Sequence, residues 1–124
     1  MPIPDLYTVE SQENKDGLLQ VAVRLHAGHR IFKGHFPGQP VLPGVCMLEM
    51  ITDILETHYT APLQIRQSPF VKFLLMIDPE KTPGIQFDIR HTREGNLITA
   101  EGRIFRDVSV FMKFQLTLEI MEIH

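Results

Sequence analysis

The feature that most constrains this chain is a run of interleaved prolines and glycines that leads directly into an apolar, helix-forming segment. The run contains Gly34, Pro37, Gly38, Pro40, Pro43 and Gly44. Residues 34–44 therefore cannot form regular helix or a central strand, and they predict a stiff loop. Apolar residues then recur at helical spacing from Met47, which predicts a helix that begins at Pro43 and ends near His58–Tyr59. Its apolar surface extends around most of the cylinder, so we expect it to be buried.

Three chemically distinctive groups occur within this segment. His35 supplies a group that exchanges protons near neutral pH. The free N–H groups near Gly44 and Val45 at the helix start favour negative charge on a ligand oxygen. Glu49 falls among apolar residues, where it must be partnered, protonated or exposed in a cleft. A base, an oxyanion site and a candidate acid thus lie within fifteen residues.

Each of these residues also has an ordinary structural interpretation. A histidine beside a glycine-rich loop is often a solvated side chain, and Glu49 can be a structural carboxylate at a subunit contact. Gly44 can simply allow close packing of the helix start. Cys46, near a helix N-terminus, is either a reactive thiol or, as is commoner, a small core residue.

The segment resembles the signature of the 3-hydroxyacyl-[acyl-carrier-protein] dehydratases of fatty-acid synthesis, which have a hot-dog fold. The matching positions are Gly34–Gly38, Pro40, Pro43–Val45 and Glu49. The resemblance implies that His35 is the catalytic histidine, that Glu49 is the acidic partner supplied by the neighbouring subunit, and that Gly44 is the backbone donor to the thioester carbonyl. A glutamate at position 49, in place of the aspartate of the isomerising branch, implies dehydration alone.

The resemblance also implies the partners. The substrate would arrive on the phosphopantetheine arm of an acyl carrier protein, and the active site would lie between two subunits of a homodimer or larger assembly. We expect His35 to remove the C2 proton while the N–H groups of Gly44 and Val45 stabilise the enolate-like oxygen. Glu49 would donate a proton to the leaving hydroxyl, or position a water while His35 makes both transfers. We expect no metal or redox cofactor.

Two positions depart from the family pattern. Asp53 stands one helical turn after Glu49, where many dehydratases have glutamine, and a second acid there would disfavour ionisation of Glu49. Residues 78–84 differ from the family's proline-glycine-aspartate turn. Both departures leave open the acyl preference, and whether the pathway is housekeeping fatty-acid synthesis or a specialised polyene or polyketide-like one.

The rest of the chain predicts strands. They are expected at residues 6–13 and 19–25, within 63–77, from Ile85 towards a turn at 94–96, at 97–105 and at 108–120. The third should be broken near Ser68–Pro69, and apolar residues of the last alternate from Val108 to Ile120. We therefore expect residues 1–124 to form a single α+β domain. An antiparallel sheet of about six strands would wrap one long central helix, and the resemblance identifies this as a hot-dog fold.

Composition excludes several classes. A net charge of −3 gives no basic footprint for nucleic acid. No apolar run approaches the ~20 residues that span a bilayer, and the first residues lack a signal-peptide pattern, so we expect no membrane insertion. One cysteine excludes an internal disulfide, which favours the cytoplasm. The basic residues that can meet an acidic carrier protein, or simply form a solvated face, are Lys33, Arg66, Lys72 and Arg103.

Two other functional classes remain open. In a hot-dog thioesterase the carboxylate would activate water against the thioester carbonyl, and free thiol would be released. A non-catalytic subunit would bind acylated carrier protein, or a heteromeric partner, without turnover. His35 and Glu49 favour the dehydratase over both.

Overall fold

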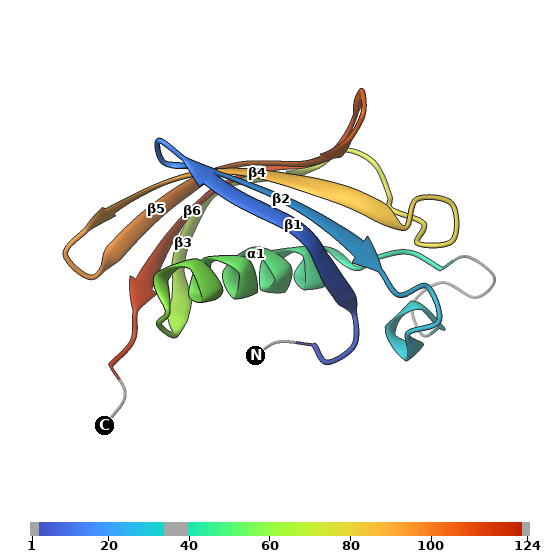
Figure 1. Cartoon of the computed structure of the whole chain (residues 1–124), viewed down its shortest axis with the longest axis horizontal. Coiled ribbons are helices and arrows are strands. Elements are labelled where there is room, and N and C mark those ends of the chain that lie inside the picture. Colours follow the sequence, from blue (N-terminus) through green and yellow to red (C-terminus); the bar gives the residue numbers. More distant parts are fainter. Residues whose placement is uncertain (1–2, 34–39, 123–124) are drawn as a thin grey trace.

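The computed structural model describes residues 3–33 and 40–122. Its elements, in chain order, are β1 (Tyr7–Lys15), β2 (Leu18–Leu25), the 3-10 helix η1 (Arg30–Lys33), α1 (Gly44–Tyr59), β3 (Leu63–Phe73), β4 (Gly84–Glu94), β5 (Leu97–Arg106) and β6 (Ser109–Ile120). The strands form a curved sheet that wraps over α1 (Figure 1). This is the hot-dog fold, as predicted.

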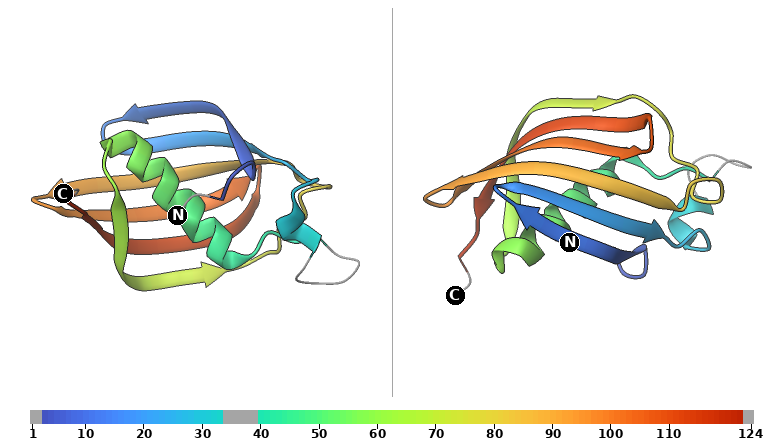
Figure 2. Two further views of the ribbon diagram at one scale, coloured as in Figure 1. Left: turned by 90° about the horizontal axis from the view of Figure 1, so that it is seen from below. Right: turned by 45° about the horizontal axis from the view of Figure 1, so that its top comes forward.

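The sheet has the strand order β1-β2-β4-β5-β6-β3, and every neighbouring pair is antiparallel. The chain leaves α1, enters β3 and pairs it with β6, so β1 and β3 form the two edges. Figure 2 shows α1 lying across the concave face between these edges. This crossing brings the far end of β3 next to the start of α1.

The core lies between the concave face of the sheet and one side of α1. In β2 and β4 every second residue is buried, as the period of a strand requires. The helix contributes Cys46, Met47, Met50, Ile51, Ile54 and Leu55. Each large apolar side chain buried in this way contributes roughly 1.5–3 kcal/mol. The packing therefore fixes the rotation of α1 and with it the direction of its polar side chains.

The helix bounds agree with the prediction to within one residue. Pro43 is the N-cap in extended conformation (φ −63°, ψ 146°), and its carbonyl accepts hydrogen bonds from the N–H groups of Cys46 and Met47. Thr60 ends the helix in the left-handed region (φ 54°). Proline suits this start because it has no N–H to leave unbonded.

The expectation that α1 is buried around most of its circumference is wrong for the single chain. Val45 is 67% exposed, and Glu49, Thr52 and Asp53 are only partly buried. The reason is geometric: the sheet covers one side of the helix. Glu49 therefore lies on the less buried side, where a carboxylate costs less than in the core.

One strand prediction needed correction. The strand expected within residues 63–77 is β3, which ends at Phe73, and the break near Ser68–Pro69 is confirmed by a register shift between Gln67 and Phe70. Val108 is 97% exposed in the turn before β6. Asp107 has a positive φ (52°), so a tight turn takes Val108 out of the alternation.

Within residues 3–33 and 40–122, no helix is long and apolar enough to cross a bilayer.

Candidate active site at the start of helix α1

The first N–H groups of α1 are available to a ligand. The N–H groups of Cys46 and Met47 bond to the Pro43 carbonyl at 3.0 and 3.2 Å. In the described part of the chain, no acceptor bonds to the N–H of Gly44 or Val45. These two donors stand at the positive end of the helix dipole, where a developing negative charge on oxygen is stabilised. Within residues 3–33 and 40–122 these two donors are free, as expected; their role in binding a substrate stays a prediction.

An apolar cavity of about 440 Å³ opens beside these donors. We call it the N-terminal cavity. It is lined by Val41, Leu42, Pro43, Gly44, Met47 and Phe73–Met76. Two backbone hydrogen bonds fix its sides: Leu42 N–H to Ile77 O (2.9 Å) and Leu74 N–H to Phe111 O (2.8 Å). Its volume and apolar lining suit a small organic ligand whose one polar end reaches the helix N-terminus.

Glu49 lies just over one helical turn after Gly44, on the partly exposed side of α1. It is engaged in an interaction and is not an isolated carboxylate. Of the three alternatives predicted for Glu49, namely partnered, protonated or exposed in a cleft, the structure supports the first. His35 lies outside the described residues, so its pairing with Glu49 stays a prediction.

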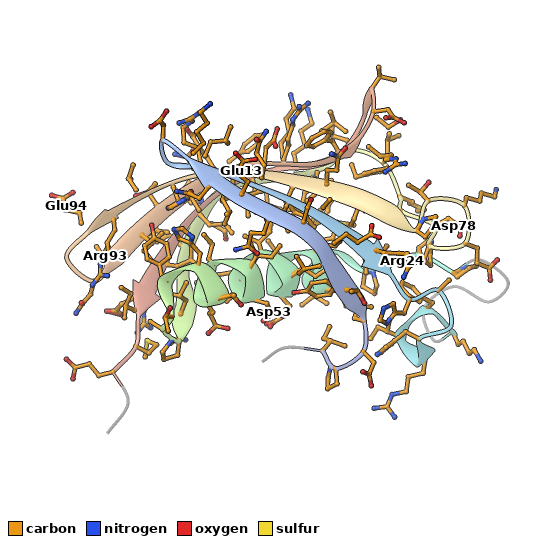
Figure 3. The ribbon with its side chains drawn as sticks, viewed as in Figure 1. Glu13, Arg24, Asp53, Asp78, Arg93 and Glu94 are labelled. Atoms are coloured by element: carbon orange, nitrogen blue, oxygen red, sulfur yellow. The ribbon has the colours of Figure 1, made fainter. Side chains whose placement is uncertain are left out.

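A second acid, Asp53, lies one turn further along. Burial raises the pKa of Asp53 to about 6, and the negative charges of Glu49 and Glu56 add to this. Among the described residues, one oxygen of its carboxylate, Oδ1, is buried without a hydrogen-bond partner. Figure 3 shows Asp53 on the side of α1 that faces away from the sheet. Repulsion from Glu49 therefore contributes to the raised pKa of Asp53, whereas the expected effect of Asp53 on Glu49 stays a prediction.

Asp53 also borders a cavity of about 610 Å³, separate from the N-terminal cavity. Tyr7 of β1 lines this second cavity, and burial followed by the Asp53 charge raises the pKa of the tyrosine to about 12. No sequence pattern predicts this neighbour, because Tyr7 and Asp53 meet only through packing of the edge strand over the helix.

Cys46 is a core residue. Its side chain is buried, and its pKa is raised by burial and then by Glu49. A raised pKa reduces the thiolate fraction, so a nucleophilic role is disfavoured. Of the two interpretations of Cys46, a reactive thiol and a small core residue, the structure favours the core residue.

Two of the four basic candidates for carrier-protein contact are used within the chain. Arg66 pairs with Glu119 at 2.6 Å, and Arg103 lies 3.4 Å from Asp88 with its guanidinium over the Phe105 ring. The side chains of Lys33 and Lys72 are exposed. The two lysines are therefore the better candidates for an acidic partner.

A buried polar network at the other end of α1 was not predicted from sequence. Tyr59 donates to His91 Nδ1 at 2.5 Å, and His91 Nε2 donates to Asn14 Oδ1 at 2.7 Å. His91 is 8% exposed, and burial followed by the charge of His58 lowers its pKa. One signal was available: His91 continues the inward alternation of β4. With every polar atom of the imidazole bonded, this network is structural.

Comparison with known proteins assigns the family. A family model described as "ApeI-like: ApeI dehydratase" matches residues 10–105. The chain belongs to the ApeI-like dehydratase family. A 3-hydroxyacyl-[acyl-carrier-protein] dehydratase FabZ from Caulobacter sp. (strain K31) is 29% identical over 86 residues, which cover 68% of this chain and 48% of the relative. The chain thus spans about half the length of this curated relative.

A second FabZ dehydratase, from Desulfotalea psychrophila, is 54% identical over 33 residues, which are 25% of this chain and 22% of the relative. Among solved structures, the dehydratase heterocomplex ApeI:P from Xenorhabdus doucetiae matches with a TM-score of 0.72 and 19% identity, covering 90% of this chain and 96% of that chain. A mutant thioesterase from Staphylococcus aureus matches with a TM-score of 0.63 and 10% identity, covering 94% and 93%. These structural matches establish the fold of this ApeI-like chain.

Proposed function

We propose that this chain dehydrates a 3-hydroxyacyl thioester, carried on an acyl carrier protein, to the trans-2-enoyl thioester in fatty-acid or related acyl-chain biosynthesis. The observation that carries the proposal is the start of α1. Within residues 3–33 and 40–122 the N–H groups of Gly44 and Val45 have no acceptor, Gly44 lines an apolar cavity, and Glu49 follows just over one turn later. An acyl chain suits the cavity, and a thioester oxygen suits the donors.

The chemistry divides among three groups. The N–H groups of Gly44 and Val45 donate hydrogen bonds to the thioester oxygen as negative charge develops on it, and a donor of this kind stabilises a transition state by about 2.7–4 kcal/mol. His35 takes the proton from C2, and the electrons of that C–H bond form the C2=C3 double bond. The C3–O bond breaks, and Glu49 supplies the proton with which the hydroxyl leaves as water. This scheme uses no metal or redox cofactor.

A second copy of the chain is the expected partner. β3 is an edge strand, and apolar side chains are exposed at its end and beyond it: Phe73, Leu75 and Met76. Unpaired strand edges with exposed apolar residues favour pairing with another chain. We infer a homodimer with the site between subunits. Because the Xenorhabdus structure is a heterocomplex, a related but different subunit is the alternative.

A carrier protein and a cytoplasmic location complete the proposal. Lys33 and Lys72 have exposed side chains that can steer an acidic partner. The location still rests on the single cysteine.

A thioesterase is the second candidate, because a thioesterase shares the fold. In that reaction a carboxylate would activate water to attack the carbonyl, and the thiol would be released.

The test is incubation of the full chain with a panel of 3-hydroxyacyl carrier-protein thioesters, followed by mass spectrometry. The proposal expects loss of water with the thioester intact, and strong reduction in His35→Ala and Glu49→Gln. Glu13→Gln is the control, since Glu13 projects from the sheet on the side opposite α1 (Figure 3). Release of free thiol would favour the thioesterase. Binding of acylated carrier protein without turnover would favour a non-catalytic subunit.

A further inference from the structure

The ring of Phe73 lies directly against Gly44, the first residue of α1. A Cβ atom added to Gly44 would lie 2.6 Å from Cζ and 2.8 Å from Cε1 of this ring. Both distances are shorter than any ordinary carbon contact. The space beside Gly44 is therefore already filled by an aromatic side chain that comes from 29 residues further along the sequence.

The backbone of Phe73 is fixed, although its ring is 52% exposed. Phe73 is the last residue of β3 and is paired in register with Met112 of β6. The next residue, Leu74, donates its N–H to Phe111 O at 2.8 Å. The sheet thus fixes the backbone of Phe73 at the entrance of the N-terminal cavity, which Phe73 and Gly44 both line.

We propose that Phe73 is a specificity-determining residue that restricts the substrate to acyl thioesters unbranched at C2. This inference rests on the proposed function, in which the thioester oxygen accepts from the Gly44 and Val45 N–H groups. C2 is bonded to the carbonyl carbon, so it must then lie close to Gly44 and to the ring that covers it. A methyl branch on C2 competes with the ring for space, whereas a straight chain can continue along the aliphatic side chains of Met47 and Leu74.

The size of the effect follows from the size of the group. One methyl group in a tightly packed apolar site changes affinity by about 10-fold or more. Truncation of Phe73 removes the obstacle, so the preference for a straight-chain over a 2-methyl acyl group should decrease. Phe70 provides a matched control, because it is an exposed phenylalanine (45%) on the same strand that does not line the N-terminal cavity.

The experiment measures binding without turnover. Pantetheine amides of a saturated straight-chain acid and of its 2-methyl analogue are titrated calorimetrically into wild type, Phe73→Ala, Phe73→Leu and Phe70→Ala. These probes contain neither a hydroxyl to eliminate nor a thioester to hydrolyse. Light scattering follows the assembly of each protein.

Wild type and Phe70→Ala should prefer the straight chain by about 10-fold, Phe73→Leu by less, and Phe73→Ala by under about 3-fold. Equal binding of both probes to wild type, an unchanged ratio in Phe73→Ala, or no binding of either probe would overturn the proposal. An equal fall in Phe70→Ala would also overturn it, since the effect would then belong to the strand edge. If Phe73→Ala alters the assembly, Phe73→Leu decides.

Dehydration assays on the same proteins separate this inference from the proposed function. Selective binding without water loss from any 3-hydroxyacyl thioester would sink the dehydratase and leave the role of Phe73. Water loss from branched and straight substrates alike would support the dehydratase and sink the proposed role of Phe73.

Discussion

The two ends of α1 are built in opposite ways. At the C-terminal end, Thr60 caps the helix and the Leu63 N–H donates to Glu56 Oε2 at 2.8 Å. There, His91 has both ring nitrogens bonded. At the N-terminal end, the N–H groups of Gly44 and Val45 have no acceptor in the described part of the chain.

This difference separates stability from function. A buried polar group that is fully bonded stabilises the fold, whereas donors left unbonded beside a cavity are free to bind something else. We call the C-terminal end of α1, around Thr60 and His91, the closed end, and the N-terminal end, at Gly44 and Val45, the open end. The closed end holds α1 on the sheet, and the donors of the open end can bind a ligand. Substitutions at the open end should therefore change activity with little loss of stability, and those at the closed end the reverse.

The largest expected effect is at the open end. Glu49→Gln should lower the rate of water loss by about 10²-fold or more, because general acid catalysis contributes about that much and glutamine cannot donate the proton. Steady-state assays on a straight-chain carrier-protein substrate measure it. The melting temperature should stay close to that of wild type. If Glu49→Gln loses water from the substrate at the wild-type rate, a group other than Glu49 is the general acid.

Gly44→Ala should lower kcat/KM by about 10-fold, since an added methyl of this kind costs roughly 1–3 kcal/mol in a packed site. The new Cβ would meet the Phe73 ring at 2.6 Å and push it over the approach to the N–H donors. Adding Phe73→Ala should recover part of the loss on the same substrate.

Gly28→Ala is the control for this substitution, because a Cβ at Gly28 meets no atom within 4 Å. A double variant no better than Gly44→Ala would show that Phe73 is not the cause.

At the closed end, Tyr59→Phe should lower the free energy of unfolding by about 1–3 kcal/mol, because it leaves the buried Nδ1 of His91 without a donor. Activity per folded molecule should not change. Urea denaturation and initial rates measure the two quantities. A loss of rate with intact stability would contradict the division between the two ends.

The same network predicts a pH dependence. The folded-state pKa of His91 lies below its ordinary value of 6.5, so the unfolded chain binds this proton first as the pH falls. The contribution of His91 to stability is complete above pH 6.5 and is lost progressively below it. The difference in unfolding free energy between wild type and His91→Gln should therefore shrink from pH 7.5 to 5. If the difference in unfolding free energy does not change with pH, the predicted contribution of His91 is contradicted.

The smallest expected effect concerns Asp53. Its pKa is raised to about 6, so the folded state holds a proton that the unfolded state has already lost, and wild type loses stability as the pH rises from about 4 through 6. Because the group is partly solvated, Asp53→Asn should stabilise the protein by only about 1 kcal/mol at pH 8. At pH 4 it should be nearly neutral. Denaturation curves at both values measure this, and equal effects would contradict it.

Local patterns in the sequence predicted most of the fold. Alternation in β2 and β4, the break at Ser68–Pro69 and the helix bounds all depend on neighbours within a few residues, which a sequence displays directly. The errors arose where tertiary placement decides. Which side of α1 faces the sheet determined the exposure of Val45 and Glu49, and a tight turn removed Val108 from its strand.

The candidate site divides in the same way. The donors at Gly44 and Val45 follow from a helix that begins after a proline, so they were predictable. The contact of Phe73 with Gly44 and that of Tyr59 with His91 join residues far apart in sequence, through the crossing of β3 and the packing of α1 on β4. No local pattern signals such contacts. The role of His35 was predicted from resemblance and stays a prediction.

The central claim is that the open end of α1 eliminates water from, and by reversal adds water to, a thioester that remains intact. The most direct test is incubation of wild type with a trans-2-enoyl carrier-protein thioester in oxygen-18 water, with fragment mass spectrometry of the products. We predict oxygen-18 at C3 of a 3-hydroxyacyl group that is still attached to the carrier. Oxygen-18 in a released carboxylic acid, or no incorporation by the folded protein, would contradict the account.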